Sequence, residues 1–166
     1  RDAGSLELPG CYAMTERGHG SNVAGVETTA TYDAATGEFI VHTPVDQAHK
    51  EFIGNAARHA RMATVFVQLI VNGDTHGVHA LLVPIRDAAG ESLPGVRIED
   101  SGEKLGLNGI DNGRLWFDQV RVPRENLLNR YADVDQQGNY TSDIASPSKR
   151  FFTTLGALVA GRVSIA

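Results

Sequence analysis

Short apolar and β-branched runs, separated by polar turns, fill most of the chain before residue 130. Residues 26–32 are rich in β-branched side chains, and residues 38–43 alternate between apolar and polar across a turn that contains Asp and Gly. This combination predicts a β-hairpin. Residues 62–71 form an apolar run too continuous for a half-exposed strand, and a polar turn leads into a returning run at 78–84. The pattern predicts a second hairpin there.

Two further strands are expected at residues 96–99 and 114–122, the second of which alternates over part of its length. Many short strands joined by turn chemistry predict a mainly β fold, an antiparallel barrel or sandwich that extends over residues 1–130. Residues 131–146 are polar and rich in Asp, Gly and Asn, which is typical of a linker.

The apolar positions change period in residues 147–166, where they recur at threes and fours. This period predicts a helix, with Ser146 as its N-cap and Pro147 in its first turn. The chain contains no other helical pattern on which its apolar stripe could pack, so a partner domain is expected to cover it. With no initiator Met and an end inside the helical pattern, we expect the chain to be a piece of a longer polypeptide.

Composition excludes several classes of partner and site. A formal net charge of −5 gives no broad basic surface for nucleic acid. One cysteine, Cys11, excludes a disulfide framework and favours a reducing compartment, where an apolar-flanked thiol is expected to be buried and inert. No apolar run approaches the ~20 residues that cross a bilayer.

The histidines and the small basic group give no strong signal for a site. His76 and His79 are separated by three positions at the start of a strand, which directs them to opposite faces. No Cys or acidic cluster completes a metal site, so ordinary histidines are favoured over metal ligands. Lys50, Arg58 and Arg61 are expected on a solvated face, with phosphate binding as the alternative.

The glycine-rich segment 10–22, GCYAMTERGHGSN, is the main candidate for chemistry. Its glycines do not have the G-x-G-x-x-G spacing, and Ser21 does not lie in a G-x-S-x-G elbow. Glycine nevertheless lets backbone N–H groups approach a ligand closely. Composition alone favours a plain loop over a binding segment.

Longer sequence motifs favour a binding segment over a plain loop. Residues 12–22 and the following GVETTATYD at 25–33 resemble the flavin-contacting signature of acyl-CoA dehydrogenases and, more closely, of acyl-CoA oxidases. Further similar motifs follow in order at residues 77–80, 93–96, 106–113 and 121–128. Several ordered motifs are more specific than one glycine loop.

The resemblance implies the middle β-domain of such an enzyme, which is flanked by N- and C-terminal helical domains in a parent that forms homo-oligomers. It implies FAD as cofactor and the conversion of acyl-CoA to trans-2-enoyl-CoA in fatty-acid β-oxidation. An oxidase reoxidised by O2 with release of peroxide is favoured. The alternatives are a dehydrogenase that passes electrons to an electron-transfer flavoprotein and a non-catalytic β-barrel binding or assembly module.

The resemblance also implies site residues by position. Those expected at the flavin are Tyr12, Met14, Thr15, Gly20 and Ser21, with a second wall formed by Phe52, Ile53 and Gly54. Those expected at the acyl-CoA are Ser21, Asp111, Asn112, Gly113 and Arg114. The catalytic base of the family is a C-terminal glutamate, so no catalytic residue is expected here and Glu16 is expected to have a structural role.

One departure from the sequence pattern of the family bears on the cellular location of the protein. Peroxisomal oxidases usually carry Trp-Trp-Pro-Gly-Gly near the second wall, whereas residues 51–55 read Glu-Phe-Ile-Gly-Asn. This difference favours a cytoplasmic bacterial protein over a peroxisomal one.

Overall fold

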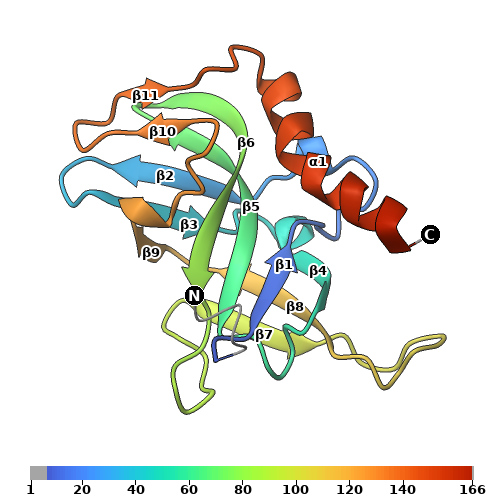
Figure 1. The fold of residues 1–166 in the computed structure, drawn as a ribbon. Helices are drawn as coiled ribbons and strands as arrows, with labels where there is room; N and C mark the ends of the chain where they lie inside the picture. The colour runs from blue at the N-terminus through green and yellow to red at the C-terminus, as the bar shows by residue number, and fades with distance from the viewer. Residues whose placement is uncertain (1–6, 166) are drawn as a thin grey trace.

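The computed structural model describes residues 7–165, which form strands, three short 3₁₀ turns and one helix (Figure 1). The strands are β1 (Gly10–Ala13), β2 (Thr29–Asp33), β3 (Glu38–His42), β4 (Lys50–Gly54), β5 (Met62–Val71), β6 (Asp74–Pro84), β7 (Val96–Asp100), β8 (Asn112–Phe117), β9 (Val120–Pro123), β10 (Asp133–Val134) and β11 (Tyr140–Thr141). The 3₁₀ turns are Val23–Gly25, Asp46–Ala48 and Arg124–Asn126, and the helix is α1 (Pro147–Ile165). The prediction of a mainly β fold followed by a helix is confirmed.

The larger sheet is organised around β5. Its partner β6 runs antiparallel along one edge, which confirms the second predicted hairpin. The opposite edge of β5 is divided between two parallel partners, because β1 pairs with residues 62–65 and β2 pairs with residues 68–70. The β2–β3 hairpin is also confirmed, and β9 extends the sheet beyond β3. This sharing of one edge carries the end of β1 toward the middle of the sheet.

The smaller sheet has the order β4-β8-β7. The single strand predicted at 114–122 is in fact two strands, because the chain turns at Asp118 and Gln119, where Gln119 has a φ of 53°. That left-handed turn moves the chain from β8 in the smaller sheet to β9 in the larger one. Alternation alone did not reveal the turn, since buried residues continue at every second position on both sides of it.

The main hydrophobic core lies between the two sheets. It combines fully buried side chains of the larger sheet with those of the smaller one, among them Phe39, Leu69, Leu81, Leu115 and Phe117. Each such side chain contributes roughly 1.5–3 kcal/mol of burial free energy. The sheets therefore form one packed unit that holds β1 and β4 in place.

Segment 131–146, expected to be a linker, contains the β10–β11 pair and is hydrogen-bonded to the sheet. Tyr32 donates its hydroxyl to the carbonyl of Gln136 at 3.2 Å, and the Asn72 amide donates to Gly138 at 2.9 Å. Polar composition was therefore compatible with a fixed connection as well as with a loose one.

The helix begins as the sequence predicts. The backbone N–H of Lys149 donates to the Ser146 hydroxyl at 3.3 Å, so Ser146 caps the first turn that Pro147 opens. Phe151 is buried in a second apolar cluster with β5 and β6, whereas Phe152 is 64% exposed. Among the described residues, no helix has the length and apolarity needed to cross a membrane.

The prediction that His76 and His79 point to opposite faces is wrong. The pairing of β5 with β6 shifts between Gln68 and Ile70, and Gly77 adopts a φ of 80° in the irregular stretch. The irregularity breaks the alternation of the strand, so both rings contact Tyr140. His76 stacks on that ring with centroids 3.8 Å apart, and the His79 Nε2 lies 3.1 Å from its hydroxyl.

Candidate cofactor site

The two segments predicted to contact the flavin lie side by side, although they are far apart in the sequence. The Thr15 hydroxyl donates to the carbonyl of Glu51 at 2.8 Å, and the Glu51 N–H donates to the carbonyl of Thr15 at 3.0 Å. The Arg17 N–H continues the pairing to the carbonyl of His49 at 3.1 Å. The chain after β1 is thus fixed against β4.

A hollow of about 490 Å³ opens beside this pairing. Its lining comes from both segments and from β8, and consists of Thr15, Glu16, Arg17, Gly20, Glu51, Phe52 and Arg114. A second hollow of about 550 Å³ under the 101–107 loop shares Phe52 and Arg114 with the first. Figure 1 shows the connection between β7 and β8 extending away from the sheets at this end. The two hollows therefore adjoin at one aromatic ring and one guanidinium.

Phe52 is unusual in both exposure and backbone. Its side chain is 63% exposed, and its φ is 58°, in the left-handed region that a bulky residue rarely adopts. Such a conformation costs on the order of 1–3 kcal/mol and persists where the surrounding structure enforces it, often at ligand sites. An exposed aromatic ring held at this cost is suited to cover a planar ligand.

An ion-pair chain fixes the polar side of the first hollow. The Arg114 Nε donates to Glu51 at 2.9 Å, and the Glu51 carboxylate also lies 2.9 Å from the His49 Nε2. Burial alone would raise the pKa of Glu51, but the hydrogen bonds from His49 and Arg114 hold this pKa below its usual value. The carboxylate is therefore charged at neutral pH and orients Arg114 at the junction of the hollows.

The remaining residues of the first predicted wall lie at different depths. Gly20 lines the first hollow and Ser21 is exposed beside it. Tyr12 is 39% exposed, with its ring 4.9 Å from that of Phe66. Met14 packs its side chain against the apolar cluster that contains Phe151, and its carbonyl accepts a hydrogen bond from Lys50 at 3.1 Å. Cys11 is buried as expected, and burial raises the pKa of its thiol to about 12.

In the second predicted wall, Phe52 faces the hollows, but Ile53 is only 2% exposed and belongs to the core. Gly54 is exposed at the end of β4. The pairing of β4 with β8 shifts between Lys50 and Ile53, and Phe52, with its positive φ, lies in this irregular stretch. Side-chain contact with a ligand at this wall is therefore restricted to Phe52.

Besides Ser21, which is exposed, the four other residues predicted at the acyl-CoA divide into two pairs. The Asp111 carboxylate accepts the N–H groups of Ala57 and Arg58 at 2.9 and 3.1 Å, so it supports the turn after β4. Gly113 is buried against the same turn. Asn112 and Arg114 instead line the second hollow. A substrate role for these residues remains a prediction.

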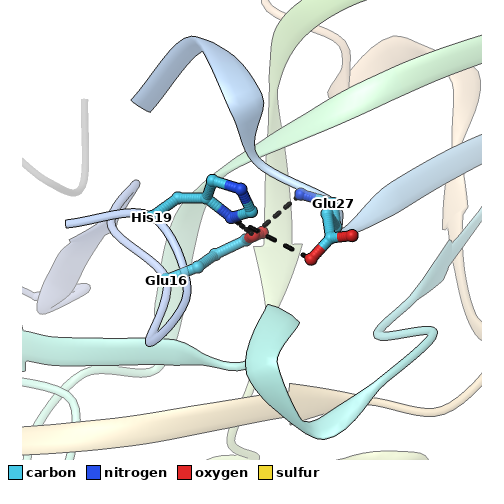
Figure 2. A group of neighbouring side chains, drawn as sticks. All are labelled: Glu16, His19 and Glu27. Atoms are coloured by element: carbon cyan, nitrogen blue, oxygen red, sulfur yellow. Dashed lines mark hydrogen bonds and ion pairs between the residues drawn. The ribbon is translucent and has the colours of Figure 1, made fainter. Parts of the chain in front are cut away.

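Glu16, His19 and Glu27 form a group of potential ligand atoms that lie within 4.8 Å of one another (Figure 2). The His19 Nδ1 lies 3.3 Å from Glu16 and 4.0 Å from Glu27. Glu16 already accepts backbone N–H groups from Glu27 and Thr28 at 2.7 and 2.9 Å. Glu16 therefore has the structural role expected of it: it ties the glycine-rich loop to the chain before β2.

The expectation of a solvated face is wrong for Lys50, which is fully buried and paired with Glu16 at 3.0 Å. The sequence around Lys50 contains no local signal for this pair, because its partner is contributed by a distant loop. Only the fold brings the two charges together.

Comparison with known proteins decides the family. Residues 11–120 match the family model described as acyl-CoA dehydrogenase, middle domain. The chain belongs to this family. It is 55% identical over 159 residues to peroxisomal acyl-coenzyme A oxidase 3 of Arabidopsis thaliana, covering 96% of this chain and 24% of that protein. It is 49% identical over 162 residues to the human peroxisomal acyl-coenzyme A oxidase 3, covering 96% and 23%. The chain therefore spans about a quarter of the length of these relatives.

Solved structures of this family have the same fold. Acyl-CoA oxidase 1 from Yarrowia lipolytica matches with a TM-score of 0.88 and 44% identity over 95% of this chain and 22% of that one. Acyl-CoA oxidase-2 from Caenorhabditis elegans, described as bound with FAD, ascaroside-CoA and ATP, matches with a TM-score of 0.83 and 42% identity. The latter match covers 85% of this chain and 22% of that one.

The expectation of a cytoplasmic bacterial protein is wrong, because relatives that match nearly the whole chain are named peroxisomal oxidases. The absent tryptophan pair at residues 51–55 is a local difference. A single exposed aromatic residue, Phe52, faces the hollow at this place. The similarity along nearly the whole chain therefore outweighs the one local difference.

Proposed function

We propose that the chain is the flavin-binding β-domain of a peroxisomal, FAD-dependent acyl-CoA oxidase. The observation that carries the proposal is the pairing of Thr15 with Glu51, because both belong to segments that line one hollow and that we propose contact the flavin. The names of the relatives support oxidase over dehydrogenase chemistry. FAD in the related Caenorhabditis oxidase supports the choice of cofactor.

The residues at the hollow fit a flavin on chemical grounds. Phe52 offers an exposed aromatic face, and Gly20 adds no side chain that would obstruct a ring. The Thr15 hydroxyl already donates to Glu51, which leaves its oxygen lone pairs free to accept from a ring N–H. A planar ring with one hydrogen-bonding edge matches this combination of groups.

FAD supplies the acceptor for the hydride that leaves the acyl-CoA β-carbon. The chain's own residues position that acceptor. With FAD bound, Thr15 would hold a hydrogen-bonding edge of the ring and Phe52 would cover a face of it and exclude water, while the Glu51 carboxylate orients Arg114 at the rim. Arg114 and Asn112, which line the second hollow, would then bind the anionic or polar parts of acyl-CoA. A carboxylate from the C-terminal helical domain of the parent removes the α-proton.

The exposed apolar residues of α1 are evidence for further helical domains in the parent. Phe152 and Val163 are 64% and 73% exposed, as expected for a helix that packs on further helices of the parent. We propose that these helical domains, together with a second subunit in a homo-oligomer, complete the cofactor site.

The full-length parent tests the proposal. It should carry flavin absorption bands after purification or FAD addition, and it should release peroxide when acyl-CoA is added. Phe52→Ala should weaken FAD binding, whereas Val45→Ala, at a similarly exposed apolar residue outside both hollows, should not. A colourless parent that does not take up FAD contradicts the proposal. Electron transfer to a carrier flavoprotein without peroxide supports a dehydrogenase instead.

A further inference from the structure

A buried lysine lies directly behind the candidate cofactor site. Lys50 has no exposed surface, and its ammonium donates to Glu16 at 3.0 Å, to the carbonyl of Met14 at 3.1 Å and to the carbonyl of Phe66 at 2.6 Å. These three acceptors use all of its donors. Burial lowers the pKa of Lys50, and the negative charge of Glu16 opposes that shift. One side chain thus connects β4, β5 and the glycine-rich loop.

Its partner Glu16 also has both carboxylate oxygens hydrogen-bonded. One carboxylate oxygen accepts the N–H and the hydroxyl of Thr28 at 2.9 and 2.7 Å. The other accepts the Glu27 N–H at 2.7 Å (Figure 2). Burial alone would raise the pKa of Glu16, but Lys50 and the hydrogen bonds from Thr28 and Glu27 bring it below its usual value. The buried pair is therefore charged and fully hydrogen-bonded.

The contacts of Lys50 surround one residue of the site. Thr15 lies between Met14 and Glu16, and the Lys50 ammonium holds both of these neighbours. Thr15 itself bonds to Glu51, the residue that follows Lys50 in β4. The position of the Thr15 hydroxyl relative to β4 is thus fixed on both sides by a single buried charge.

Stability alone does not explain this arrangement. Replacing a buried ion pair by apolar residues of similar volume is often neutral or stabilising, because removing two charges from water is costly. Apolar side chains could fill the same volume but could not hold the carbonyls of Met14 and Phe66 at fixed directions. What the charged pair adds is a defined geometry for the loop that carries Thr15.

We propose that Lys50 is a positioning residue of the oxidase, which sets the Thr15 hydroxyl at the flavin edge through Met14 and Glu16. The inference rests on the proposed function. A reacting group displaced by about 1 Å loses on the order of 10²-fold in rate. Removal of Lys50 should therefore lower kcat by about 10- to 100-fold, with KM changed by less than about threefold.

The test uses the full-length parent and separates geometry from folding. Lys50→Met leaves Glu16 as an unpaired buried charge and should lower Tm. The double variant Lys50→Met with Glu16→Gln removes both charges, retains an acceptor for Thr28 and should recover Tm. A second double variant, Lys50→Gln with Glu16→Gln, serves if the first does not give folded protein. Lys149→Met, at an exposed lysine, is the control.

We expect the folded double variant to bind acyl-CoA with near-normal KM, to show an altered flavin absorption band and to retain the deficit in kcat. Recovery of kcat and of the flavin spectrum together with Tm would overturn the proposal, because Lys50 would then serve folding alone. A wild-type parent without flavin or activity would refute the proposed function itself, a result obtained before any variant is compared.

Discussion

The hydroxyl of Thr15 gives the sharpest single prediction, because it makes one hydrogen bond within the chain and is proposed to make another to the flavin. Thr15→Val keeps the β-branched shape and removes the 2.8 Å hydrogen bond to Glu51. The backbone bond from the Glu51 N–H to Thr15 at 3.0 Å remains, so the pairing of the two segments should persist. The variant therefore measures the contribution of the Thr15 hydroxyl alone.

The expected magnitudes follow from the net value of a hydrogen bond. Loss of the bond to Glu51 should reduce the free energy of unfolding by about 1 kcal/mol. Loss of the proposed bond to the flavin should cost about 1 kcal/mol of binding, which raises the FAD dissociation constant about fivefold. Thr15→Ser retains the hydroxyl and should bind FAD within about twofold of the wild type.

The assay is fluorescence titration of the deflavinated full-length parent with FAD, with Thr141→Val, at an exposed threonine in β11, as the control. Equal FAD affinity for Thr15→Val and the wild type would refute the assigned contact. Equal weakening by Thr15→Ser and Thr15→Val would show that packing rather than the hydroxyl is responsible.

Three further predictions concern other parts of the chain. His79 is 7% exposed and burial lowers its pKa from 6.5 to about 4, so the unfolded chain binds more protons than the folded chain between these values. The free energy of unfolding should therefore decrease by about 3 kcal/mol as the pH drops through the whole of that window. In denaturant unfolding, His79→Gln should lose less stability over the same pH range than the wild type. Gly113→Ala would place a Cβ 2.7 Å from the Ala57 backbone nitrogen and should lower the free energy of unfolding by about 1–3 kcal/mol. In the same measurement Gly109→Ala should be nearly neutral, because its Cβ would meet nothing within 4 Å. The isolated chain should bind FAD far more weakly than the parent, because its hollows lack the other domains, and tight binding in a calorimetric titration would contradict this expectation.

The elements that the sequence predicted well depend on local signals. The two hairpins and the helix cap at Ser146 follow from alternation, turn residues and short-range capping chemistry. The turn at Asp118 and Gln119 was missed because buried positions alternate within β8 before it and within β9 after it. The directions of His76 and His79 were mistaken because an irregular pairing around Gly77 has no unambiguous sequence signature.

In the candidate site, too, local sequence signals were informative and long-range contacts were not. Motifs identified the segments around Thr15 and Phe52, but not that Met14 and Ile53 would direct their side chains into apolar clusters. The pairing of Lys50 with Glu16 depends on two distant segments meeting, and neither residue carries a local signal of burial. Long-range contacts of this kind become visible only in the folded chain.

The most direct test of the account is the crystal structure of the full-length parent with FAD. We predict that the flavin ring lies in the hollow between the Thr15 and Phe52 segments, with a polar atom of the ring about 3 Å from the Thr15 hydroxyl and the Phe52 ring in van der Waals contact. A flavin bound elsewhere, with neither Thr15 nor Phe52 in contact, would contradict the proposed cofactor site.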